Sequence, residues 1–189
     1  MNREDVQALL DEFVESDVLK RHLAAVSAAM RYYARKSGED EEEWALVGLL
    51  HDFDWDLVGE SEEHPFRGAG ILKERGFPEH IVRAVLSHGD DTGVLRQSLM
   101  EKTLYAVDEL SGFVIAVALI RPSKSLDDLE PRSVKRKMKD KGFARAVKRQ
   151  DIARGAEELG IDLDEHIANV IEGLKPMAAE LGLNTSTPA

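Results

Sequence analysis

Cysteine is absent from the 189 residues of this chain. Without thiols the protein cannot form disulfides, thiolate zinc sites or a cysteine nucleophile. A metal site would therefore have to be built from imidazole nitrogen and carboxylate oxygen. Six histidines and 36 acidic residues supply both kinds of ligand.

Long apolar runs are also missing. No stretch reaches the roughly 18 apolar residues of a membrane span, and the acidic segment 1–13 lacks the apolar core of a signal peptide. Hydrophobic residues make up 43% of the chain and charged residues 32%, a balance typical of globular domains. We therefore expect a cytoplasmic protein with one domain over residues 1–183 and a disordered tail at 184–189.

Positive charge is scarce outside one segment. The net charge is -11, which argues against binding to polymeric nucleic acid because phosphate backbones attract cationic surfaces. Residues 121–149 contain eleven Lys/Arg against four Asp/Glu, a local charge of +7, so the rest of the chain carries -18. The sequence thus places a basic segment within an acidic protein.

Alternating β-branched runs are absent, and apolar residues recur at helical spacing almost throughout. The pattern predicts an all-α, single-domain helical bundle. The predicted helices cover about 4–14, 17–36, 40–51, 67–75, 78–88, 99–120, 151–159 and 163–181, with two further short helices in the basic segment. Residues 53–66 are expected to form a polar loop.

Histidine and aspartate lie on the apolar faces of several predicted helices. His22 shares a face with Val26, and Asp108 lies on the long helix 99–120. Each histidine alone could be a hydrogen-bonded core residue, but buried carboxylates at Asp52 and Asp108 require a compensating cation. With His51 they could converge on a divalent metal in the core, and Mn, Fe, Co, Ni, Mg or Zn would suit such ligands.

The order of these motifs resembles the HD superfamily of metal-dependent phosphohydrolases, in particular its HDIG branch. The matching motifs are His22, LLHD at 49–52, HPFRGAGIL at 64–72, VLSHGD at 85–90 and Asp108 in YAVDELSG. The resemblance covers about residues 20–115 and implies that His22, His51, Asp52 and Asp108 bind a first metal. It implies that His64 and His88 bind a second metal, with Asp52 bridging the two.

The segment RPSK at 121–124, followed by SVKRKMKDKGFA, is similar to the C-terminal part of uncharacterised bacterial HD proteins. Other features depart from better-known branches. The Ile-Gly-Lys that often follows the His-Asp pair is missing, and HGDDTG contains neither a second histidine nor the Gly-Tyr-Pro signature of cyclic-di-GMP phosphodiesterases. Asp54 and Asp56 only loosely match the acidic motif of ppGpp hydrolases, so the sequence does not identify the substrate.

The resemblance implies a hydrolase that acts on a small phosphorylated metabolite or nucleotide, as mono- or diester, with one or two divalent metal ions. A metal-bound hydroxide would attack phosphorus, and Asp52 is the predicted catalytic residue. A di-iron oxygenase with the same kind of ligand set is a second possibility. A non-catalytic metal- or ligand-binding regulatory module is a third. The oligomeric state is left open.

The basic segment allows two interpretations. It is either a solvated face or, more specifically, a phosphate clamp in which Arg121 and Lys124 fold back over the metal.

The remaining polar and aromatic candidates are each open to two interpretations. Asp54, Asp56, Asp90 and Asp91 are candidates for orienting ligands or transferring protons, but they could equally be solvated loop acids. His80 and His166 are interpreted as ordinary histidines, and Trp55 as a packing residue that could also form a wall for a substrate ring.

Overall fold

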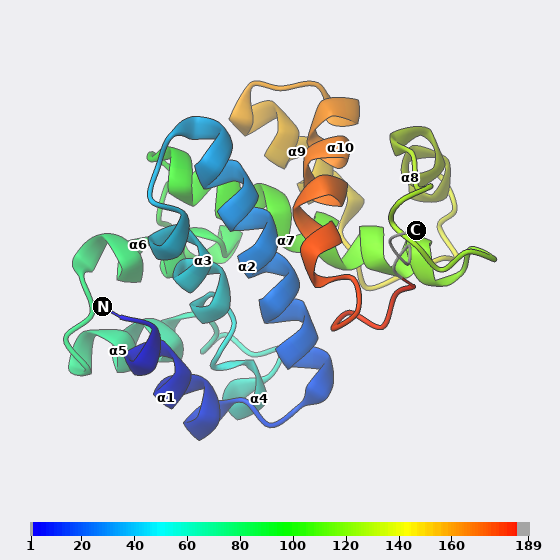
Figure 1. Cartoon of the computed structure of the whole chain (residues 1–189). Helices are drawn as coiled ribbons and strands as arrows, with labels where there is room; N and C mark the ends of the chain where they lie inside the picture. The colour runs from blue at the N-terminus through cyan, green and yellow to red at the C-terminus, as the bar shows by residue number, and fades with distance from the viewer. Residues whose placement is uncertain (1, 185–189) are drawn as a thin grey trace.

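The computed structural model describes residues 2–184, and the secondary-structure elements in that range are all helices (Figure 1). The all-α prediction is therefore confirmed. The α-helices are α1 Arg3–Phe13, α2 Asp17–Ser37, α3 Glu41–Leu50, α4 Trp55–Val58, α5 Phe66–Glu74, α6 Glu79–Ser87, α7 Leu99–Leu119, α8 Pro131–Met138, α9 Arg149–Leu159 and α10 Leu163–Leu174. Two 3₁₀ turns, η1 Asp90–Thr92 and η2 Lys175–Met177, complete the list.

The two longest helices, α2 and α7, start at strong N-caps. The hydroxyl of Ser16 accepts hydrogen bonds from the first turn of α2. Ser98 and Glu101 form a reciprocal capping box at α7, which satisfies backbone N–H groups that have no partner within the helix. The two helices pack against each other and against α10 in the centre of the molecule.

Helix α3 folds back along α2 after a short turn. Asp40 caps α3 by accepting from the N–H groups of Glu42 and Glu43, both at 2.9 Å. The close approach depends on Gly48, where an added Cβ would lie 2.6 Å from the Cα of Ser27. Only glycine fits at this crossing, which positions the end of α3 beside α2.

Helices α9 and α10 cover α7 from the other side. His166 on α10 is fully buried, and its Nε2–H donates to the carbonyl of Ala106 on α7 at 2.9 Å. Its Nδ1 accepts from the hydroxyl of Tyr33 on α2 at 2.7 Å. His166 is thus a hydrogen-bonded core residue that joins three helices. His80, by contrast, is exposed and contacts Glu43.

Three segments differ from the sequence prediction. The expected loop 53–66 contains α4, which Asp56 holds by accepting from the N–H groups of Glu15 and Ser16 at 2.8 Å each. The basic segment forms one helix, α8, instead of two. In the turns after α8, the carbonyls of Ala144 and Val147 accept hydrogen bonds from the guanidinium of Arg149. The last helix ends at Leu174 because Pro176 has no N–H to continue it.

Hydrogen bonds fix the chain as far as Asn184, further towards the C-terminus than the sequence predicts. The backbone N–H of Asn184 donates to the carbonyl of Lys124 at 2.7 Å, and its side chain donates to Ser123. Asn184 was assigned to the disordered tail, but these bonds fix it. Residues 185–189 lie outside the described part of the chain.

One hydrophobic cluster extends from Val6 in α1 to Leu183 near the C-terminus. Residues of both the N-terminal helices and the C-terminal helices contribute to it. Within residues 2–184, none of the helices combines the length and the hydropathy that crossing a bilayer requires.

Candidate metal centre

Six side chains from separate parts of the chain meet between α2, α3, α6 and α7. His22 lies in the second turn of α2 and Asp108 in the middle of α7. His51 directly follows α3, and His88 directly follows α6. Asp52 and His64 lie in the connections that flank α4. These are the six residues that the sequence predicted as metal ligands, and their ligand atoms face one another in two groups.

The first group consists of His22, His51, Asp52 and Asp108. The Nε2 atom of His22 lies 3.1 Å from Nε2 of His51 and 3.1 Å from Oδ1 of Asp108. Oδ2 of Asp52 lies 3.3 Å from Nε2 of His51 and 3.6 Å from Nε2 of His22. Two nitrogens and two oxygens therefore surround one point.

The second group shares Asp52 with the first. Its other oxygen, Oδ1, lies 3.3 Å from Nε2 of His64 and 3.0 Å from Nε2 of His88. The two oxygens of one carboxylate thus face two different pairs of imidazoles. Such an arrangement could hold two cations with Asp52 between them.

The hydrogen bonds behind the cluster orient the imidazole rings. Nδ1 of His51 donates to the carbonyl of Gly48 at 2.8 Å, and Nδ1 of His88 donates to the carbonyl of Val85 at 2.5 Å. A carbonyl only accepts, so Nδ1 carries the proton in both rings. The neutral ring then presents the lone pair of Nε2 to the cluster, which is the form that binds metal.

Asp54 does the same for His64. Its Oδ1 accepts from Nδ1 of His64 at 2.8 Å, and its Oδ2 accepts from the backbone N–H of Gly68 at 2.7 Å. An added Cβ at Gly68 would lie 3.0 Å from the carboxylate, so a side chain there would crowd Asp54. The first glycine of the HPFRGAGIL segment therefore serves the orientation of His64.

The electrostatics of the metal-free cluster favour charged groups. Burial opposes charge on His51, but Asp52 and Asp108 outweigh it and raise the pKa of His51 well above its usual value. Burial opposes charge on His64 as well, yet Asp52 and Asp54 raise its pKa to about 9. Despite burial, neighbouring imidazoles hold the pKa values of Asp52 and Asp108 well below the normal range. Protons on imidazole thus balance the carboxylates, and a divalent cation would replace those protons.

One buried oxygen of the cluster is an unsatisfied hydrogen-bond acceptor. Oδ1 of Asp52 is buried and accepts no hydrogen bond of acceptable geometry, although His64 and His88 lie within 3.3 Å. A buried carboxylate oxygen without a donor is costly. A cation between Asp52 and these two nitrogens would satisfy it, so the residues present fit a divalent metal of the kind that binds imidazole and carboxylate.

The two predicted phosphate-binding residues do not join the cluster. Helix α7 continues for eleven residues after Asp108, which carries its end about 17 Å away. Arg121 beyond that end pairs with Asp128 at 2.7 Å, and Lys124 is exposed next to Asn184. In Figure 1 this part of the chain lies towards α8, away from α5.

The acidic candidates separate in the structure. Asp54 is fully buried beside His64, so its interpretation as a solvated loop acid was wrong. Asp56 anchors α4 to the start of α2. Asp90 pairs with Arg96 at 3.1 Å and with Arg154 at 2.6 Å, and Asp91 is exposed. Only Asp54 of these four contacts a member of the cluster directly.

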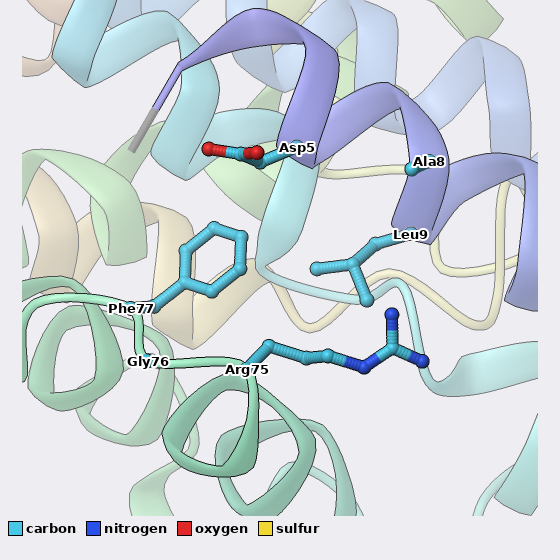
Figure 2. Close-up of a pocket in the computed structure, with 6 residues that line it drawn as sticks. All are labelled: Asp5, Ala8, Leu9, Arg75, Gly76 and Phe77. Atoms are coloured by element: carbon cyan, nitrogen blue, oxygen red, sulfur yellow. The ribbon is translucent and has the colours of Figure 1, made fainter.

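A separate cavity of about 230 Å³ lies between α1 and the turn that joins α5 to α6 (Figure 2). Leu9 and Phe77 face each other across it, and the side chain of Arg75 extends along one side. The guanidinium of Arg75 donates a hydrogen bond to the carboxylate of Glu12 at 2.8 Å. No residue of the candidate metal centre lines this cavity.

Comparison with known proteins agrees with the motif pattern. A model of the HD domain family matches residues 19–112, a segment that contains all six residues of the cluster. Neither the curated proteins nor the solved structures gave a match. The family suggested by the motifs is confirmed at the level of the HD domain, whereas the metal-binding roles of the six residues stay predictions. Through residues 19–112, this chain belongs to the HD domain family.

Proposed function

We propose that this protein is a metal-dependent hydrolase that cleaves a phosphomonoester or phosphodiester bond in a small phosphorylated metabolite or nucleotide. The observation that carries the proposal is the position of Asp52, whose two oxygens face separate pairs of imidazoles. Membership of the HD domain family supports the same chemistry. The net charge of -11 favours a small substrate over polymeric nucleic acid.

Each residue of the cluster has a defined task in this proposal. His22, His51, Asp52 and Asp108 would hold one cation, and Asp52 with His64 and His88 would hold another. A bound divalent cation lowers the pKa of a water ligand towards neutrality and supplies a nucleophile. Asp54 accepts a hydrogen bond from Nδ1–H of His64 and so keeps Nε2 of that ring directed at the cluster. The carbonyls of Gly48 and Val85 do the same for His51 and His88.

Metal content and phosphate release, measured on the same samples, test the proposal. Wild type, Asp52→Asn and the exposed control Asp91→Asn are analysed by plasma mass spectrometry. The same samples are then assayed on a panel of phosphomonoesters and diesters with Mn, Fe, Co, Ni, Mg or Zn added. We expect near-stoichiometric metal and hydrolysis of at least one ester in wild type and control, and loss of both in Asp52→Asn. Failure to bind any of these metals would overturn the proposal.

The composition of the cluster favours a second candidate. Four imidazoles accompany only two carboxylates, a nitrogen-rich set that suits iron better than magnesium. A di-iron oxygenase is therefore the alternative. Iron as the dominant metal, together with substrate-dependent oxygen consumption and no phosphate release, would favour it over the hydrolase.

A further inference from the structure

Two aromatic side chains within residues 2–184 are exposed, and one of them contacts the candidate metal centre. Of its eleven aromatic residues, only Trp55 and Phe66 are exposed, by 38% and 48%. The other nine are buried or pack against the core. Trp55 contacts the ring of His64, and Phe66 follows His64 by two residues. The exposed ring of Trp55 thus borders a member of the candidate metal centre.

Trp55 is close to the cluster. Its ring centroid lies 5.1 Å from that of His64, with the two planes at 82°. Nε2 of the same imidazole ring lies 3.3 Å from Oδ1 of Asp52. The indole therefore contacts a member of the cluster directly.

The indole lies outside the buried core. Helix α4 has no buried residue, and the Asp56 carboxylate fastens it to the start of α2. The second tryptophan, Trp44, is only 3% exposed and belongs to the core. A large aromatic ring that is fixed at a site but left open to solvent is typical of a binding surface.

We propose that Trp55 stacks against a planar aromatic ring of the substrate while the phosphoryl group lies at the metal centre. This inference rests on the proposed function and narrows its substrate class to phosphorylated compounds that carry a nucleobase. Stacking on an aromatic side chain tolerates different bases, so Trp55 provides affinity for the ring without selecting one base.

Tryptophan fluorescence tests the inference without relying on catalysis. Trp44→Phe leaves Trp55 as the only tryptophan, and Trp55→Phe leaves only Trp44. Each variant is titrated in Mg²⁺ buffer with adenosine monophosphate and with ribose 5-phosphate, which has the sugar phosphate but no base. We expect saturable quenching of Trp55 by adenosine monophosphate alone, and no change in the emission of Trp44.

Affinity provides a second measurement. In titration calorimetry, wild type should prefer adenosine monophosphate over ribose 5-phosphate. Trp55→Ala should reduce this preference by about five- to 150-fold, the range measured when a stacking aromatic is truncated. Leu57→Ala, an exposed apolar truncation on the same helix, should retain the preference of wild type.

The possible outcomes separate this inference from the proposed function. Quenching of Trp55 by the nucleotide, without hydrolysis of any monoester or diester in any metal, would support the aromatic site and overturn the hydrolase. Equal responses to both ligands, or no response of Trp55, would overturn the aromatic site even if phosphate is released. A Trp55 signal that depends on protein concentration, with a dimer seen by sedimentation, would also overturn it and assign the surface to a second copy of the chain.

Discussion

The carboxylate of Asp54 accepts a hydrogen bond from Nδ1–H of His64 at 2.8 Å, although His64 lies ten residues further along the chain. This bond fixes which nitrogen of His64 faces Asp52. It also gives the fully buried carboxylate of Asp54 a hydrogen-bond donor. Loss of the carboxylate should therefore affect metal binding selectively, since Asp54 touches only one of the two groups of ligands.

Asp54→Ala should weaken the binding of one metal of a pair by about 10- to 100-fold, the usual effect of removing a partner that orients a ligating histidine. Titration calorimetry of the metal-free protein with Zn²⁺ would resolve the two steps. The step that depends on His22 and Asp108 should keep its affinity. Asp91→Ala, an exposed change nearby, is the control. Equal weakening of both steps would contradict the separate roles.

The stability of the metal-free protein should fall as pH rises above neutrality. The pKa of His64 is raised to about 9 in the fold, against about 6.5 in the unfolded chain. The stabilisation from its protonated form is complete below about pH 6.5 and is lost as pH rises through about 9. Urea denaturation in the presence of a chelator, between pH 6 and 9.5, should show this slope in wild type. The slope should be weaker in His64→Gln, and identical slopes would refute the assignment.

His166 should have the opposite effect at acidic pH. Burial lowers its pKa to about 4, so the unfolded chain takes up the proton first. Its contribution is complete above about pH 6.5 and decreases by up to about 3 kcal/mol as pH falls to about 4. Carboxylates also titrate in this range, so the quantity to measure is the difference between wild type and His166→Gln. A difference that does not change between pH 7 and 4 would exclude this role.

Two glycines in helices offer a matched comparison of packing. Gly48→Ala would place a Cβ 2.6 Å from the Cα of Ser27, and separating α3 from α2 should cost about 1–3 kcal/mol of unfolding free energy. Gly70 on α5 has no heavy atom within 4 Å of the corresponding position. Gly70→Ala should be neutral or stabilising by up to about 1 kcal/mol. Thermal unfolding of both variants checks this, and equal Tm values would disprove the steric explanation.

The sequence predicted most of the fold and the six residues of the cluster, because both depend on local patterns. Helical spacing predicted α2 and α7 to within a residue or two of their ends, and the order of short motifs indicated the His and Asp set. Ser16 caps the start of α2 and Gly38 follows its last residue, so both ends of this helix correspond to local sequence signals.

Features that depend on contacts distant in sequence could not be predicted. The buried carboxylate of Asp54 finds its hydrogen-bond partners in His64 and Gly68, 10 and 14 residues further along, and nothing in the sequence next to Asp54 indicates this pairing. Arg121 and Lys124 were expected at the metal because they follow the helix of Asp108. The length of α7 itself carries them away from that residue. Spacing along the chain does not fix a position in space once a long helix intervenes.

The bond from His166 to the carbonyl of Ala106 has a consequence for shortened versions of the protein. The family match ends at residue 112, but α10, which carries His166, begins at Leu163. A fragment cut at the limit of the match would leave Tyr33 without its acceptor and expose the apolar side of α7. The smallest unit that should fold and express in soluble form therefore extends to Leu183, well beyond residue 112, where the family match ends.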